Sequence, residues 1–290
     1  MARVPSEKVS SRRELLGAGG AAALGLLLGG QALRAAQAEV SPASSVKYGM
    51  VIDLERCMGC RACMMACKTE NNTLTAVFWM YVFRFEEGRY PNVRLSYLPR
   101  PCMHCDNPPC VKVCPVAARY KRRDGLVATD FDRCIGCRYC EVACPYSVNY
   151  FNWKDPGKNQ YLDWSASPEL QQVTGGAIPP YRNPDLEARY GLERRRIAGG
   201  GHLRGVIEKC TFCVHRIENG LLPACVANCP AGALHFGDLN DPDSVVSRLL
   251  TQKPSYRQAE EYGTEPSVYY LGPPPPGPGA RALDAIVRRV

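Results

Sequence analysis

The chemistry-bearing residues of this 290-residue chain are its 16 cysteines, which fall into four sets of four. The clearest set lies in the run C-I-G-C-R-Y-C-E-V-A-C-P, from Cys134 to Pro145. Three of its cysteines are separated by two residues each, and the fourth follows after three more. A loop with this spacing can bind three irons of a [4Fe–4S] cluster, while in two-cluster ferredoxins the fourth thiolate ligates the other cluster. The spacing therefore predicts iron–sulfur clusters that occur in pairs.

The other three sets repeat this arrangement. The first has the same spacing, whereas the second and fourth have a longer gap before their third cysteine. The three sets are Cys57, Cys60, Cys63 and Cys67; Cys102, Cys105, Cys110 and Cys114; and Cys210, Cys213, Cys225 and Cys229. Sixteen cysteines in four such sets predict four [4Fe–4S] clusters.

Other uses of cysteine fit this pattern less well. Zinc ribbons use pairs of C-x-x-C knuckles and have no use for a C-x-x-C-x-x-C triplet. Disulfides would suit an exported protein, yet cysteines three apart on a tight loop are poorly placed for unstrained bridges. The C-x-x-C-H motif of covalent haem attachment is absent. A cysteine-rich protein that holds zinc or disulfides remains the alternative from another functional class, and visible absorption would distinguish it.

Short strands and turns are predicted around the cysteine sets. We expect strands at residues 47–54 and 126–129, and a hairpin turn at Asp124-Gly125, so that Cys102–Cys144 resembles a complete two-cluster ferredoxin. A further strand through His235-Phe236 and a helix should follow Cys229. Sets one and three share C-x-G-C-R-x-C. The predicted fold class is therefore α+β, with two pseudo-symmetric bacterial-ferredoxin-like two-cluster units, an irregular insertion and an extended C-terminal arm.

Exchange of the fourth cysteine within each unit predicts the cluster ligands, because sets two and three form one unit and sets one and four are left for the other. The predicted ligands are Cys57, Cys60, Cys63 and Cys229 for cluster 1; Cys67, Cys210, Cys213 and Cys225 for cluster 2; Cys102, Cys105, Cys110 and Cys144 for cluster 3; and Cys114, Cys134, Cys137 and Cys140 for cluster 4. No catalytic residue is predicted.

The chain divides into six predicted segments. Residues 1–38 carry Arg12-Arg13, a weakly apolar stretch and Ala36-Gln37-Ala38, and resemble a twin-arginine export signal; a retained membrane anchor is the alternative. The others are 39–101 with the first set, 102–150 as a ferredoxin unit, the turn-rich insertion 151–208, 209–271 with the fourth set, and the proline-rich tail 272–290. We expect the tail to lie on a partner or in solvent.

The net charge of +8 does not indicate a nucleic-acid partner, because each oxidised cluster with four thiolates carries roughly −2. The basic runs 119–123 and 194–196 are expected to be solvated faces, with partner docking as the alternative. His104 and His215 are expected to be packed or partner-facing histidines, although both could tune a cluster. Three cations are positioned to offset cluster charge: Arg61, Arg138 and Lys68, the last standing where the other sets have proline.

Two further runs, Cys105–Cys110 (C-D-N-P-P-C) and Glu208–Arg216 (E-K-C-T-F-C-V-H-R), resemble the four-cluster iron–sulfur subunits of molybdopterin oxidoreductases. Within that family the chain resembles the electron-transfer subunits of tetrathionate and polysulfide reductases and their periplasmic relatives. The resemblance implies a large molybdopterin subunit and an integral membrane subunit that interacts with quinone as partners. It also implies that cluster 1 faces the catalytic subunit and cluster 4 the membrane side.

The sequence thus predicts an exported, periplasmic electron-transfer subunit, membrane-associated through its partners, that relays single electrons between them. The alternative is a relay in a respiratory complex without molybdenum, partnered with cytochromes in nitrite- or sulfite-linked respiration.

Overall fold

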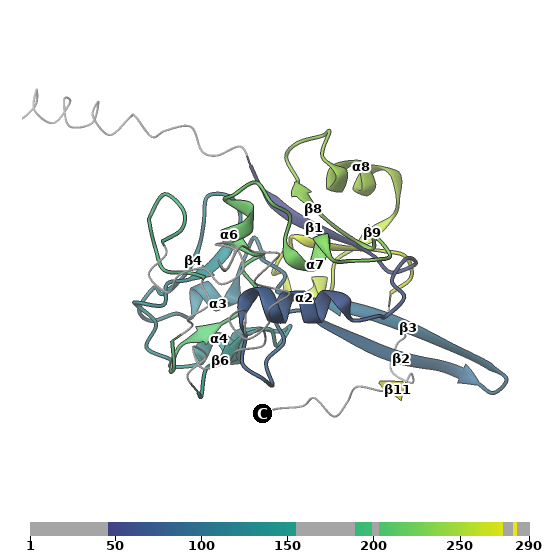
Figure 1. The fold of residues 1–290 in the computed structure, drawn as a ribbon, viewed down its shortest axis with the longest axis horizontal. Coiled ribbons are helices and arrows are strands. Elements are labelled where there is room, and N and C mark those ends of the chain that lie inside the picture. Colours follow the sequence, from purple (N-terminus) through teal and green to yellow (C-terminus); the bar gives the residue numbers. More distant parts are fainter. Residues whose placement is uncertain (1–45, 155–188, 199–202, 275–280, 283–290) are drawn as a thin grey trace, which may run out of the picture. The chain divides into compact units, whose positions relative to one another are not determined.

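Strand β1 (Tyr48–Asp53) is an inner strand of the largest sheet (Figure 1). The structure is a computed structural model, and it describes residues 46–154, 189–198, 203–274 and 281–282. These residues belong to one compact unit that begins at Ser44. The predicted export signal at 1–38 lies outside the described residues. Within the described ranges, no helix is long and apolar enough to cross a membrane.

The sheet around β1 has the strand order β8-β1-β10-β9, with β8 at Leu234–Asp238, β9 at Ser255–Tyr256 and β10 at Val268–Leu271. Strand β1 runs parallel to β10 and antiparallel to β8. Its side chains alternate between two cores, as a strand covered on both faces requires. Met50 and Ile52 join the main core, which also contains many of the cysteines, whereas Val51 packs with Val246 of helix α8 (Val245–Gln252). The strands predicted at 47–54 and through His235-Phe236 and the helix after them are confirmed.

A long hairpin formed by β2 (Tyr81–Arg89) and β3 (Asn92–Arg100) was not predicted. Strand β11 (Arg281–Ala282) pairs with β2 on its other edge (Figure 1). The expectation that the tail lies on a partner or in solvent is therefore wrong for these two residues, because their backbone completes a three-stranded sheet of this chain. The other tail residues after 274 lie outside the described residues.

Two small hairpins frame the remaining segments. Strands β4 (Arg119–Lys121) and β5 (Val127–Thr129) pair antiparallel around the predicted Asp124-Gly125 turn, where Gly125 has a φ of +85°. Strands β6 (Tyr150–Phe151) and β7 (Ile207–Glu208) pair at the two ends of the insertion, so that the chain leaves and returns at neighbouring positions. Most of the insertion, 155–188 and 199–202, lies outside the described residues.

Short helices accompany every cysteine set: α2 (Ala62–Asn71), α3 (Pro109–Lys112), α4 (Tyr139–Ala143), α6 (Val214–Ile217) and α7 (Ala224–Ala227), with a short 3-10 turn at Glu260–Tyr262. Helix α2 packs on α7, and α3 packs on α4. Sets one and four therefore share one neighbourhood, and sets two and three share another. Helices and strands are mixed, as the predicted α+β class requires.

Candidate iron–sulfur site

All four cysteine loops turn at the same place, the residue before the second cysteine. Gly59, His104, Gly136 and Phe212 have φ values of +69°, +43°, +69° and +53°. This left-handed conformation favours glycine. At Gly59 and Gly136 an added Cβ would also lie 2.2 Å from the Tyr97 ring and 2.1 Å from the Gly205 carbonyl oxygen, respectively. His104 and Phe212 adopt the same conformation with a side chain, so it is the close packing over Gly59 and Gly136 that requires glycine in C-x-G-C-R-x-C.

The arginines of the same motif also adopt a shared conformation. Arg61 and Arg138 have φ values of +62° and +63°, and each precedes the helix that carries the next cysteine. Arg138 forms an ion pair with Glu141, with a distance of 2.9 Å between Nε and Oε2, so its charge is already partly balanced.

Two cavities each bring one predicted ligand set together. One is lined by Cys102, Cys105, Cys110 and Cys144, and the other by Cys114, Cys134, Cys137 and Cys140. Each encloses about 320 Å³ of space free of protein atoms, part of it open to solvent. In both cavities the fourth cysteine comes from the other sequence set. The exchange of the fourth cysteine is therefore a property of the fold here, while the binding of iron stays a prediction.

The other eight cysteines form two groups by mutual proximity. Burial raises the pKa of Cys57, and the nearby charges of Cys229 and Cys60 raise it further. Burial similarly raises the pKa of Cys67, with Cys213 and Cys210 as the next causes. Cys63 shares the neighbours Cys57, Cys229 and Cys60, and Cys225 shares the neighbours Cys213, Cys67 and Cys210. These are the sets predicted for clusters 1 and 2.

The chemistry of these groups fits a polynuclear iron centre. All sixteen cysteines are free thiols. Burial is the main cause that raises the pKa of Cys105 and Cys210 to about 12, so thiolates would form there only beside a strong cationic centre. Metal coordination supplies such a centre, because a coordinating thiol is deprotonated. Across the described residues, no three His, Cys, Asp or Glu side chains converge closely enough for a single metal ion.

We number the four cysteine groups after the clusters predicted for them, and groups with consecutive numbers are neighbours in the fold. Cys63 of group 1 raises the pKa of Cys67 of group 2, after burial and the nearer thiols. Cys102 of group 3 is, after burial, the largest cause that raises the pKa of Cys210 of group 2. Arg119 contacts Cys140 of group 4, and the charge of Cys110 of group 3 acts on the same arginine. Cys60 and Cys137, in the two outer groups, are exposed, whereas seven of the eight inner cysteines are buried.

Comparisons with known proteins identify this arrangement. Residues 93–160 and 200–239 match the 4Fe-4S dicluster domain, and residues 48–69 match a 4Fe-4S binding domain. A selenate reductase subunit from Mesobacillus selenatarsenatis is 43% identical over 79% of this chain and 73% of its own length. The arsenate respiratory reductase iron-sulfur subunit of Shewanella is 42% identical over 78% of this chain and 96% of its own length. The menaquinone reductase iron-sulfur cluster-binding subunit of Nitratidesulfovibrio vulgaris is 37% identical over 78% of this chain and 89% of its own length.

The chain belongs to the family of iron–sulfur subunits of molybdopterin reductases. Its members transfer electrons and contain no catalytic centre of their own. The [4Fe–4S] cofactor is therefore confirmed, and sixteen cysteines fit the predicted number of four clusters, whereas the ligands of each cluster stay a prediction.

The cations of this iron–sulfur subunit are less exposed than the sequence indicated. Arg119 is only 2% exposed, and its Nη2 donates to Cys140 Sγ at 3.5 Å. Arg122 is mostly buried beside Asp124 and Glu218, and Arg196 pairs with Asp132. The interpretation of the basic runs as solvated faces is wrong for these residues, because each contacts an acidic group or a thiol within the fold.

Lys68 is also buried. Its Nζ donates to the carbonyl oxygens of Leu74 at 2.6 Å and Val77 at 2.9 Å. Burial lowers its pKa to about 8, against the charge of the adjacent Cys67. Its ammonium group therefore fixes the loop that follows helix α2 while lying close to group 2.

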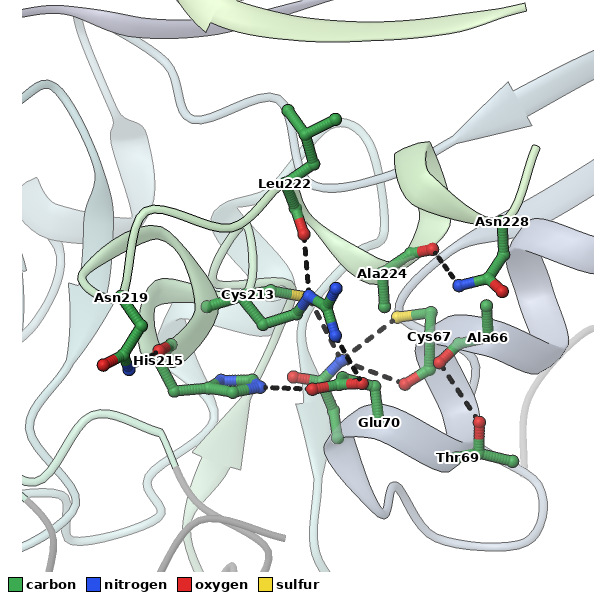
Figure 2. Close-up of polar contacts among 12 residues, drawn as sticks. Ala66, Cys67, Thr69, Glu70, Cys213, His215, Asn219, Leu222, Ala224 and Asn228 are labelled. Carbon is green, nitrogen blue, oxygen red and sulfur yellow. Dashed lines mark hydrogen bonds and ion pairs between the residues drawn. The ribbon is translucent and has the colours of Figure 1, made fainter. Parts of the chain in front are cut away.

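Both predicted histidines are buried within the chain. His104 accepts a hydrogen bond from the Val127 N–H at 3.0 Å through Nδ1, and its ring stacks on Phe212 with centroids 3.9 Å apart. Burial, followed by the charge of Lys209, lowers its pKa well below the usual value. Figure 2 shows His215 directed at Glu70 of helix α2, with 3.0 Å between Nε2 and Oε1. The expectation that both are packed histidines is confirmed.

Asn71 is a residue at the site that sequence reasoning missed. Its Nδ2 lies 3.7 Å from Cys67 Sγ and 3.6 Å from Cys213 Sγ, and donates to the Cys67 carbonyl oxygen at 2.9 Å. Hydrogen bonds to cysteine sulfur are one of the ways in which a protein sets a cluster's reduction potential. The sequence signal that could have revealed it is Lys68, because the absence of proline there allows α2 to continue to Asn71.

Proposed function

We propose that this chain is a periplasmic subunit that relays single electrons through four [4Fe–4S] clusters between a quinone-reactive membrane subunit and a molybdopterin catalytic subunit. The observation that carries the proposal is the row of four cysteine groups with an exposed cysteine in each outer group. A cluster exchanges one electron at a time, and burial of the inner groups keeps that exchange away from solvent. The relatives named for selenate and menaquinone reduction support an acceptor at one end and a quinone at the other.

The fold of this relay consists, in our proposal, of two pseudo-symmetric ferredoxin-like units. The packing of α2 on α7 and of α3 on α4 supports this division. So do the matching conformations of Arg61 and Arg138 and of the two loop glycines. In each unit the fourth cysteine of one set completes the cluster of the other.

The two ends of the row face different partners in this proposal. Cluster 1 faces the catalytic subunit and cluster 4 the membrane subunit, as the family resemblance implies. Exposed apolar side chains surround the last group: Ile135, Tyr139 and Val142 lie in the same loop and helix as exposed Cys137. Such a gathering is typical of a surface that a partner covers.

The clusters supply the electron-accepting chemistry when bound, and the chain supplies their environment. Asn71 donates to sulfur, Arg119 brings positive charge, and burial of the inner groups excludes water. No proton transfer or bond cleavage is assigned to any residue.

The test is anaerobic purification of the tagged chain from membranes of its own organism, with analysis of bound metals and co-purifying chains. We expect iron, a large subunit with molybdenum or tungsten, and a multi-helix membrane subunit. A quinol analogue should bleach the iron–sulfur absorption of this complex. Iron-free protein, or clusters that no quinol reduces in the intact complex, would contradict the proposal.

A second candidate rests on the menaquinone reductase relative, whose name specifies a quinone reaction and no terminal oxyanion. In that case the chain is a relay in a respiratory complex without molybdenum, partnered with cytochromes. The same purification distinguishes the two, because haem in place of molybdenum or tungsten would select this second function.

Export by the twin-arginine route is tested separately. Substitution of Arg12 and Arg13 by lysine, together, should leave the chain in the cytoplasmic fraction with its iron still bound, because the paired arginine is the recognised feature. Normal periplasmic recovery of this double variant would contradict the proposed route.

A further inference from the structure

Two buried cations lie at the junctions between neighbouring cysteine groups. Arg119 of strand β4 and Lys209, just before Cys210, are each 2% exposed. Buried charges are costly unless they are paired, so the positions of these two side chains require an electrostatic partner.

Arg119 lies between groups 3 and 4. Its guanidinium contacts Cys140 of group 4 and lines that group's cavity, while its backbone N–H donates to Cys114 Sγ at 3.4 Å. Cys110 and Cys102 of group 3 are also near enough to act on it: their charges, with that of Cys140, raise its pKa against the effect of burial. A guanidinium is always protonated in a protein, so this buried positive charge lies beside cysteines of both groups.

Two nitrogen atoms of the Arg119 side chain make no hydrogen bond within the described part of the chain. These atoms, Nε and Nη1, are both buried. A guanidinium presents five N–H donors in a rigid fork, so these remaining donors suit a negatively charged group in the adjoining cavity. The cavity that Arg119 lines is that of cluster 4, and the cysteines of group 3 that act on it are Cys110 and Cys102.

Lys209 occupies the preceding junction. Its Nζ donates to the Val127 carbonyl oxygen and, at 2.9 Å, to that of Cys210, and its side chain lines the cavity of group 3. Its charge acts on Cys110 of group 3 and on Cys210 of group 2, lowering the pKa of each against the raising effect of burial. It therefore stands between groups 2 and 3 as Arg119 stands between groups 3 and 4.

We infer that Arg119 and Lys209 are shared electrostatic partners of adjacent clusters, each raising the reduction potentials of both clusters at its junction. Reduction adds one electron to a cluster that is already negative, and a buried cation stabilises the reduced form more than the oxidised form. Because one cation serves two clusters, it also offsets the repulsion that an electron on one cluster exerts on its neighbour. One electron leaves a cluster and enters the next, and no bond forms or breaks.

The experiment measures the midpoint potentials of individual clusters by redox titration followed by electron paramagnetic resonance, in iron-replete complex. Arg119→Gln should lower the equilibrium constant for one-electron reduction of clusters 3 and 4 at least tenfold each, which lowers each midpoint potential by about 59 mV or more. The midpoint potentials of clusters 1 and 2 should not change. Arg119→Lys, which keeps the charge, should restore most of the shift. Arg123→Gln is the matched control, because Arg123 is an exposed arginine of the same hairpin and its charge is screened by water.

Lys209→Gln tests the junction between groups 2 and 3 independently. It still tests the inference if Arg119→Gln fails to retain iron. It should lower the potentials of clusters 2 and 3, so that cluster 3 responds to both substitutions and cluster 1 to neither. Unchanged potentials in iron-replete variants, or an equal fall of all four, would overturn the inference. The inference rests on the proposed relay, but its failure is distinguishable: missing clusters in the wild-type chain contradict the relay, whereas unshifted potentials contradict only the role of the cations.

Discussion

Helices α2 and α4 begin alike and end differently. Both follow a Cys-x-Gly-Cys loop and start after an arginine with a φ near +62°. Helix α4 ends after five residues, and Cys144 is extended, with a ψ of 113°, because it precedes Pro145. Helix α2 has Lys68 at the corresponding place and continues to Asn71, ten residues in all. A single residue after the fourth cysteine thus decides whether the helix ends at the cluster or runs on beside it.

The extra turn of α2 carries the polar contacts of group 2. Glu70 binds His215 and Arg216, at 3.0 and 3.1 Å, and Asn71 reaches two cysteine sulfurs. In the other half Asn149 lies beyond the end of α4, donates to the Cys140 carbonyl oxygen at 2.9 Å and lines the cavity of group 3. The two halves therefore share a loop for holding a cluster and differ in how the cluster's surroundings are built.

The largest expected effect comes from giving α2 the ending of α4. Lys68→Pro should destabilise the protein by about 3 kcal/mol or more, because proline removes a donor and clashes inside a helix. It also removes the buried bonds from Lys68 to the 74–77 loop. We expect a lower thermal midpoint and loss of about a quarter of the iron, the share of one cluster in four. Full iron and an unchanged midpoint in Lys68→Pro would refute this account of α2.

The next effect concerns the crossed ligands. Cys67→Ser should alter the spectroscopic signal of cluster 2 and spare cluster 1, although Cys67 shares a helix with Cys63. Cys144→Ser should likewise alter the signal of cluster 3 and spare cluster 4, because the fourth cysteine of one set completes the cluster of the other. Paramagnetic resonance of the two iron-replete variants measures this, and a change in cluster 1 or cluster 4 instead would refute the exchange.

A smaller effect is expected from the buried ion pair of the longer helix. Glu70→Gln should cost about 1.5–3 kcal/mol in the free energy of unfolding, the typical contribution of hydrogen bonds to charged groups. Glu141→Gln on α4 removes the half-exposed pair with Arg138 and should cost clearly less, because water screens exposed charges. Denaturant titration compares the two variants. Equal losses would mean that burial of Glu70 adds nothing.

The smallest effect separates the two asparagines. Asn71→Leu should lower the midpoint potential of cluster 2 by on the order of tens of millivolts, since 59 mV corresponds to a tenfold change for one electron. Asn149→Leu removes a bond to a carbonyl oxygen beside the cavity of group 3, so it should cost about 1 kcal/mol of stability and leave the potential of cluster 2 unchanged. A shift of cluster 2 in Asn149→Leu, or none in Asn71→Leu, would contradict a direct action of Asn71 through sulfur.

Local signals made much of this structure predictable. The cysteine spacings, the Asp124-Gly125 turn and the apolar run of β1 each depend on a few neighbouring residues, and each appears where it was expected. The β2–β3 hairpin was missed although Tyr81–Phe85 is rich in residues that favour strands before Gly88. Its signal was present in the sequence but is weaker than that of the cysteine sets beside it.

The positions of Arg119 and Asn71 could not be predicted from sequence in the same way. Arg119 opens a basic run that typically indicates a solvated face, and what buries it is Cys140, 21 residues further on. Asn71 acts on Cys213, 142 residues away, because α2 packs close to the fourth set. Contacts of this kind depend on tertiary packing rather than on local pattern.

The central position of β1 sets an order of assembly. Its partners, β8 and β10, lie about 180 to 220 residues further along the chain, as the pairing of Tyr48 with Asp238 and of Met50 with Val268 shows. Contacts so distant in sequence form slowly, because a long loop must close before they form. By contrast, residues 102–144 contain every cysteine of groups 3 and 4. During synthesis every cysteine of groups 3 and 4 is therefore present before the fourth set, which completes groups 1 and 2, has been made.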